Sequence, residues 1–114
     1  MISKFNVPQA VVTQTVVHEL IHAYDSCRAE VDWTNCLHIA CSEVRAANLS
    51  GDCTFKNELS RGHYDFKGQG GACIRRRAGI SVASHEQCRE KSKLAVEAVF
   101  DNCVADIAPF MNRI

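Results

Sequence analysis

The chain has 114 residues, the length of one domain, and we expect residues 1–114 to form a single domain. Its 13 lysine and arginine residues balance its 13 aspartate and glutamate residues, so the formal net charge is zero. A zero charge argues against the basic composition typical of nucleic-acid-binding proteins, and we predict no nucleic-acid partner. No uninterrupted apolar run reaches the ~18 residues that a membrane-spanning helix requires.

The first predicted element is a helix from about Pro8 to Ser26. Proline suits the first helical position, and the apolar run from Ala10 to Tyr24 carries the helix onward. Because apolar residues lie on nearly every side of this run, we expect the helix to be buried nearly all round.

This helix contains His18-Glu19-Leu20-Ile21-His22. Residues four apart lie one above the other on the same helix face, so His18 and His22 can bind one metal ion, usually zinc. Glu19 lies beside them and could accept a proton from a water on that metal. The alternative is a core helix with two incidental histidines, at a high desolvation cost. We predict His18 and His22 as metal ligands and Glu19 as the catalytic residue.

Neither residue just beyond His22 suits the role of third ligand. Some zinc proteases place this ligand six residues after the second histidine, but Arg28 occupies that position and its guanidinium cannot bind a cation. Asp25 lies roughly 10 Å along the helix from His18, too far for easy ligation. We expect Asp25 to make an outer hydrogen bond or a helix-end contact.

A second helix is predicted from about Asn35 to Leu49. Asp32 or Thr34 could cap its start, and Ser50-Gly51 is a typical C-terminal stop. The apolar positions that we expect to face the core are Leu37, Ala40, Cys41 and Val44.

Glu43 on this second helix is the candidate third ligand. Its neighbours three and four residues away are all apolar, so its carboxylate needs a metal or an arginine as partner. It follows His22 by 21 residues, which leaves room for a turn and an antiparallel helix. The alternative is a buried pair with Arg28 or Arg45. His38 is a weaker candidate ligand.

The second half of the chain contains a glycine-rich loop and a further predicted helix. Gly62–Gly71 holds four of the six glycines, and its His63 or Tyr64 could stabilise an oxyanion, although both could be ordinary loop residues. Arg75-Arg76-Arg77 fits a solvated helix face, or less simply a contact with anionic lipid.

Asp52–Arg61 is predicted to be a short helix or an irregular strand. Ser84-His85-Glu86-Gln87 resembles a capping box that opens a long exposed helix to about Asp106. We expect one side of that helix to carry Cys88, Lys91 or Ser92, Ala95, Val99 and Cys103.

Seven cysteines is a high number for so short a chain. No two of them form a Cys-x-x-Cys pair, which argues against a structural zinc ribbon. We therefore predict disulfide bonds and an oxidising compartment, with one cysteine left over. Seven reduced core cysteines are the alternative.

Together these residues resemble the family of mitochondrial inner membrane metalloproteases that help to assemble ATP synthase. The resemblance extends from about Val11 to Phe110, and its segments are His18–Asp25, Cys27-Arg28, Asp32–Cys36, Ala40–Arg45, Leu49–Cys53 and Cys73–Arg77. It implies the metal ligands His18 and His22 and the catalytic Glu19.

The resemblance also implies a fold and a function. The expected fold is mostly α, the helical part of a zincin-like metalloprotease, rich in disulfides and with little or no sheet in this chain. The expected function is that of a Zn²⁺-dependent metalloendopeptidase that processes the precursor of a membrane subunit of ATP synthase and aids assembly. Peripheral association with the intermembrane-space side of the mitochondrial inner membrane is implied. The alternative is a non-catalytic assembly chaperone or binding module.

Relatives in this family have a substantial segment before the zinc helix. That segment includes further cysteines and the sheet with which zinc proteases hold an extended substrate. We therefore expect the chain to correspond to the C-terminal portion of the family, a single zinc metallopeptidase domain without the N-terminal segment.

Overall fold

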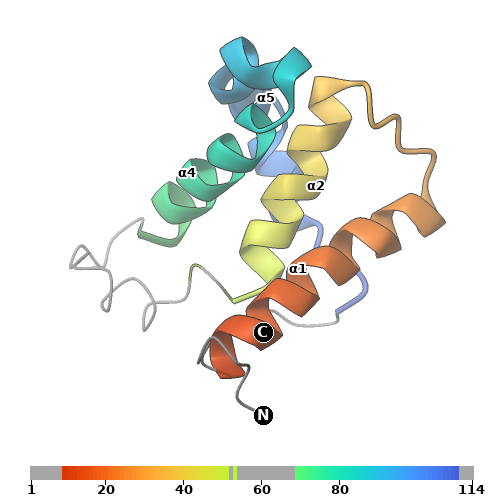
Figure 1. The fold of residues 1–114 in the computed structure, drawn as a ribbon, viewed down its shortest axis with the longest axis vertical. Helices are drawn as coiled ribbons and strands as arrows, with labels where there is room; N and C mark the ends of the chain where they lie inside the picture. Colours follow the sequence, from red (N-terminus) through yellow and green to blue (C-terminus); the bar gives the residue numbers. More distant parts are fainter. Residues whose placement is uncertain (1–8, 52, 54–68, 111–114) are drawn as a thin grey trace.

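The computed structural model describes residues 9–51, 53 and 69–110, and these residues form a small helical assembly (Figure 1). Its elements are α1 (Gln9–Arg28), α2 (Cys36–Leu49), α4 (Gln69–Ala83), a 3₁₀ helix (Glu86–Lys91) and α5 (Ser92–Ala105). The described residues contain no strand. The predicted mostly helical fold is therefore confirmed.

Helix α2 is the centre of the assembly. It packs against α1, α4 and α5, and it is buried almost throughout from Ile39 to Leu49. One core joins Ile39, Ala40 and Val44 of α2 to apolar side chains of α4 and α5, among them Ile74, Ala78, Val82, Ala95, Val96 and Phe100. Leu37, predicted to face this core, is instead 47% exposed because the buried stretch of α2 begins only at Ile39.

Helix α1 lies on the outside of the assembly, across α2 (Figure 1). Ile21 is 2% exposed and packs with Ala46 and Leu49 of α2, whereas Val16 and Leu20 are 50% and 59% exposed. The prediction that this helix is buried nearly all round is therefore wrong. Its apolar residues cover more than one face, but α2 is its main neighbour among the described helices.

The start of α2 is capped by Asn35. The Asn35 side chain accepts hydrogen bonds from the backbone N–H groups of Leu37 (2.9 Å) and His38 (3.4 Å). Asp32 and Thr34, the predicted caps, bond to each other instead, since the Asp32 carboxylate accepts from the backbone N–H (2.9 Å) and hydroxyl (2.6 Å) of Thr34. The helix therefore begins one residue later than predicted.

The end of α2 agrees with the sequence pattern. Ser50 is its C-terminal cap, and Gly51 adopts a positive φ of 83° that a residue with a side chain rarely accepts.

The segment after α4 differs from the single helix predicted from Ser84 to Asp106. The Ser84 hydroxyl donates to the Ser81 carbonyl oxygen (2.6 Å) at the end of α4, so it does not cap a following helix. A 3₁₀ helix comes first, and α5 begins only at Ser92. Of the residues expected along one side of this segment, Cys88, Ser92, Ala95 and Cys103 are buried.

The predictions for the glycine-rich loop and the segment before it can be compared with the structure only in part. Gly70 and Gly71, expected in the glycine-rich loop, belong to the first turn of α4. His63 and Tyr64 lie outside the described residues, and so does Asp52–Arg61 apart from Cys53.

Three disulfides fasten the helices to one another, which confirms the predicted use of the cysteines. Cys36–Cys88 joins α2 to the 3₁₀ helix, Cys41–Cys103 joins α2 to α5, and Cys53–Cys73 holds the end of the α2 segment to α4. Cys27 is the free, exposed cysteine. None of the described helices combines the length and apolarity of a membrane span.

Candidate metal centre

Helices α1 and α2 bring together the side chains of His18, His22 and Glu43. One potential ligand atom from each lies within 4.8 Å of the other two. The Oε1 atom of Glu43 is 3.3 Å from His18 Nε2 and 3.2 Å from His22 Nε2. The two imidazole rings meet edge to face, with centroids 4.9 Å apart. The sequence predicted this set of three residues.

The local structure explains why they converge. His18 and His22 share one face of α1 because they lie four residues apart. The turn after α1 is short, and α2 returns against α1 so that Glu43 faces the two imidazoles. Each residue therefore comes from a regular helix and not from a loop.

Glu43 is buried in a way that fits a metal ligand. The residue is 8% exposed, and its Oε1 atom is buried without a hydrogen-bond partner. Both Nε2 atoms nevertheless lie at ion-pair distance from this oxygen. Three donor atoms facing one point, with no hydrogen bond to Oε1, is the arrangement that a shared cation requires. Two imidazole nitrogens and one carboxylate oxygen are also a common ligand set of catalytic zinc.

The electrostatics of the centre favour a cation. Burial raises the pKa of Glu43, but the close approach of His18 and His22 to its carboxylate outweighs burial and lowers that pKa to about 2. Burial lowers the pKa of His22, while Glu43, aided by Glu19 and Asp25, raises it above 6.5 overall. The carboxylate is thus negatively charged at neutral pH and favours a positive charge beside it.

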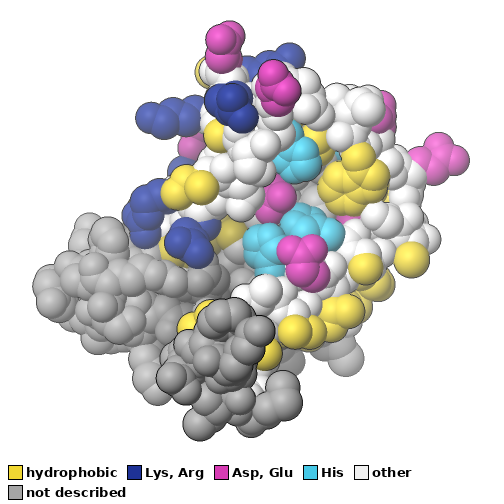
Figure 2. Space-filling model, in the orientation of Figure 1, with side chains coloured by type: hydrophobic (Ala, Val, Ile, Leu, Met, Phe, Trp, Pro, Cys, Tyr) yellow, Lys and Arg dark blue, Asp and Glu magenta, His cyan; other side chains and the backbone are white. Residues whose placement is uncertain are grey.

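Glu19 lies on the open side of the centre. It is exposed on α1, and together with His18 it borders a cavity of about 340 Å³ between α1, α2 and α4. Thr15, Ala47 and Ile80 also line this cavity. Figure 2 shows histidine side chains and acidic side chains gathered on the same exposed face of the molecule. The arrangement therefore leaves a carboxylate and an open cavity next to His18, one of the three residues.

The arginines predicted as alternative partners of Glu43 make other contacts. Arg45 pairs with Asp25 (Nη2–Oδ1 2.8 Å), and Arg28 pairs with Asp106 (Nη2–Oδ2 2.5 Å). His38, the weaker candidate ligand, accepts a hydrogen bond from the Asp32 backbone N–H (2.9 Å). Asp25 is buried and accepts hydrogen bonds from α2, in keeping with the outer role expected of it.

The sequence reasoning did not identify Ser42, whose Oγ lies 2.7 Å from Nδ1 of His22. The signal was available, because Ser42 precedes Glu43 and is carried toward α1 by the same antiparallel return. It was missed because serine by itself suggests no role in a metal centre.

Comparison with known proteins identifies the family of the chain. The model of the peptidase M76 family matches residues 3–111. A human protein named mitochondrial inner membrane protease ATP23 homolog is 52% identical over 104 residues, which are 90% of this chain and 42% of the human protein. The homolog of the same name from Xenopus laevis is also 52% identical, over 90% of this chain and 44% of its own length.

A fungal relative extends the similarity. The mitochondrial inner membrane protease ATP23 of Mycosarcoma maydis is 45% identical over 105 residues, 90% of this chain and 48% of that protein. The chain thus spans less than half the length of these relatives. No solved structure gives a significant match, so the zincin-like character of the fold stays a prediction. The family match covers nearly the whole sequence, and the chain therefore belongs to the peptidase M76 family.

Proposed function

We propose that this chain carries the catalytic centre of a zinc-dependent metalloendopeptidase. The observation that carries the proposal is the buried Glu43 Oε1, which has no hydrogen-bond partner and lies 3.2 and 3.3 Å from two imidazole nitrogens. In this assignment His18, His22 and Glu43 hold the zinc ion.

The chemistry divides between the metal and one carboxylate. Zinc bound by these residues would act as a Lewis acid that makes water more acidic and polarises the scissile carbonyl. Glu19 accepts the proton of the attacking water and returns it to the leaving amine. Its exposed position beside His18, on the edge of the 340 Å³ cavity, supports this role because an exposed carboxylate can reach a water molecule there.

The relatives' names suggest where such an enzyme works. Both animal and fungal relatives are named mitochondrial inner membrane proteases, and we extend that location to this chain. The resemblance found in the sequence further suggests the intermembrane-space side, peripheral membrane association and the precursor of an ATP synthase membrane subunit as substrate. Three disulfides support an oxidising compartment.

The test measures zinc and cleavage separately on the oxidised chain. We expect about one zinc per wild-type chain by elemental analysis, and cleavage of peptides that span the processing site of the subunit precursor. Glu19→Gln should keep its zinc and lose cleavage by a factor of at least about 10². His22→Ala should lose both, whereas Glu90→Gln, a change at an exposed glutamate of the 3₁₀ helix, should lose neither.

Each departure from this pattern has a distinct meaning. Absence of zinc from the wild-type chain would refute the proposal that the protein is a zinc enzyme. Undiminished cleavage by Glu19→Gln would refute the role assigned to Glu19. Zinc binding without any cleavage, combined with Glu19→Gln that still supports ATP synthase assembly in cells, would favour the non-catalytic assembly role.

A further inference from the structure

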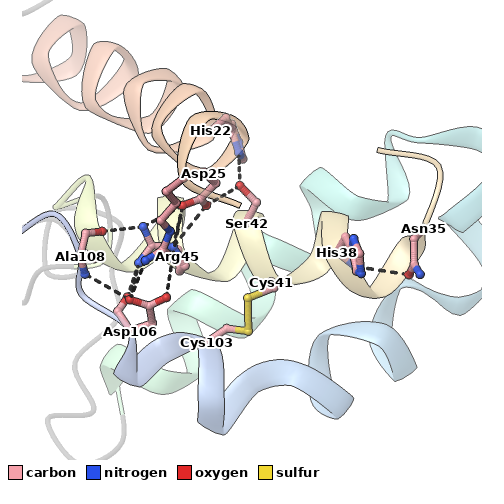
Figure 3. Close-up of a disulfide and its surroundings, with 11 residues drawn as sticks. His22, Asp25, Asn35, His38, Cys41, Ser42, Arg45, Cys103, Asp106 and Ala108 are labelled. Atoms are coloured by element: carbon pink, nitrogen blue, oxygen red, sulfur yellow. Dashed lines mark hydrogen bonds and ion pairs between the residues drawn. A yellow bond between two sulfur atoms is a disulfide. The ribbon is translucent and has the colours of Figure 1, made fainter. Parts of the chain in front are cut away.

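A chain of hydrogen bonds extends from His22, away from the proposed metal, into the interface of α1 and α2 (Figure 3). Nδ1 of His22 lies 2.7 Å from Oγ of Ser42, and the Ser42 hydroxyl donates to Oδ2 of Asp25 at 2.8 Å. Ser42 is 2% exposed and Asp25 is 4% exposed. The contact between Ser42 and Asp25 is therefore shielded from water, and the contact between His22 and Ser42 is partly shielded.

The positions of the protons follow from the donor and acceptor capacities. An ionised carboxylate can only accept, so the hydrogen between Ser42 and Asp25 must come from the serine hydroxyl. That hydroxyl has one proton, and its oxygen can therefore only accept from His22. Nδ1 of His22 must then carry a hydrogen. In the neutral imidazole that ligates a metal, Nε2 is left with the free lone pair, and Nε2 is the atom that faces Glu43.

Arg45 holds the carboxylate of Asp25 in position. The guanidinium of Arg45 is 1% exposed and reaches Oδ1 of Asp25 from Nε at 3.0 Å and from Nη2 at 2.8 Å. Arg45 is itself fixed, because it also donates to the backbone carbonyl oxygens of Asp106 and Ala108. A guanidinium fixed beside Asp25 holds its carboxylate in place, facing Ser42.

We propose that Ser42 and Asp25 are positioning residues of the metal centre, which fix His22 with its hydrogen on Nδ1 and its Nε2 lone pair toward the ion. The inference rests on the proposed function, since it gives His22 the role of a zinc ligand. It adds a second layer of residues that contact neither metal nor substrate. In metal centres, partners of this kind orient the ligand ring and increase its basicity.

Zinc affinity is the first test, measured on the oxidised 114-residue chain by competition with a chromophoric chelator. Ser42→Ala should weaken zinc binding by about 10- to 100-fold. Ser42→Thr, which keeps the hydroxyl, should recover most of that loss. Ser92→Ala removes the hydroxyl of another buried serine, on α5, and should leave the affinity unchanged. Asp25→Asn should also weaken binding, but it disturbs Arg45 as well, so the Ser42 variants decide.

A spectroscopic signature separates positioning from a general effect on structure. In the zinc-loaded wild-type chain we expect the Nδ1–H proton of His22 to exchange slowly and to give an observable NMR signal. Ser42→Ala should broaden or abolish that signal and leave the ring signals of His18 in place. Ser92→Ala should change neither.

The outcomes distinguish this inference from the function beneath it. If the wild-type chain binds no zinc, both the proposed function and this inference are refuted. If the wild type binds zinc and the affinity of Ser42→Ala lies within twofold of the wild-type affinity, the inference alone is overturned. An unchanged His22 Nδ1–H signal in Ser42→Ala would overturn it as well. Equal weakening by Ser42→Ala and Ser92→Ala would do the same, because it would indicate a non-specific loss of stability.

Discussion

Replacing Arg45 by methionine tests the buried charge cluster that joins α1, α2 and the turn after α5. Arg45 is 1% exposed, pairs with Asp25 and donates to the carbonyl oxygens of Asp106 and Ala108 (Figure 3). Methionine fills a similar volume without charge or hydrogen-bond donors. The substitution therefore removes the electrostatic contacts while it leaves little empty space.

The expected loss of stability can be worked out from these contacts. Removing one partner of a buried ion pair costs about 3–5 kcal/mol. Asp25 keeps its hydrogen bond from Ser42 and a more distant, 3.5 Å contact with Arg28. The cost of leaving Asp25 without Arg45 should therefore lie near the lower end of that range, at about 3 kcal/mol. The two carbonyl oxygens together add about 1 kcal/mol, because water can replace part of what they lose. We expect the free energy of unfolding to fall by about 4 kcal/mol.

Urea denaturation of the oxidised, zinc-free chain, followed by far-ultraviolet circular dichroism, measures this loss. With a denaturant slope of about 2 kcal/mol per molar urea, the midpoint should fall by about 2 M. The control is Arg75→Met, which removes an arginine whose side chain is 41% exposed, pairs with Glu97 and lies over the ring of Phe100. Its cost should be about 1 kcal/mol. Equal losses from the two substitutions would refute the reasoning.

A double variant isolates the charge itself. Asp25→Asn removes the negative charge that Arg45→Met would leave buried, so the double variant should be at least about 1 kcal/mol more stable than the sum of the single losses implies. Strictly additive losses would show that the two residues act independently.

Two further predictions concern the outer helix and the acid range. Ile21→Ala should lower the free energy of unfolding by about 2–4 kcal/mol, because Ile21 is 2% exposed. Leu20→Ala should lower it by less than about 0.5 kcal/mol, because Leu20 is 59% exposed. Equal losses in urea denaturation would mean that α1 does not pack against α2 through Ile21. The hydrogen bond from Arg28 lowers the pKa of Asp106 below its ordinary 3.8, so Asp106 contributes stability above that pH that is lost as the pH falls through its folded pKa. The unfolding free energy of the wild type should therefore fall more steeply below pH 3.8 than that of Asp106→Asn, and parallel pH curves would contradict this assignment.

Features that depend on near neighbours in the chain could be predicted. The spacing of His18 and His22 fixes both imidazoles on one side of α1 whatever surrounds the helix. The stop at Ser50-Gly51 likewise depends on a local backbone conformation that glycine permits. The number of cysteines indicated disulfides, but it could not give the pairing, which joins residues up to 62 positions apart. That the two histidines bind zinc stays a prediction.

Local patterns failed where several residues could fill the same role. Asp32, Thr34 and Asn35 all can cap a helix, and only the backbone of the turn selects Asn35. Ser84 and Gln87 match a capping box, yet the Ser84 hydroxyl turns back to the end of α4. Leu20 is as apolar as a core residue, but it faces away from α2.

By itself the sequence predicted the helices α1 and α2, the shared face of two imidazoles, and that a carboxylate at Glu43 would need a partner; it did not predict α4 or the break between the 3₁₀ helix and α5. Only the tertiary structure decided that this partner is the pair of histidines, that Arg45 goes to Asp25 instead, and that Ser42 contacts His22. The physical reason is distance along the chain. Positions within one helix are related by a fixed geometry, whereas contacts between helices depend on how their side chains pack, and that is a property of the whole assembly.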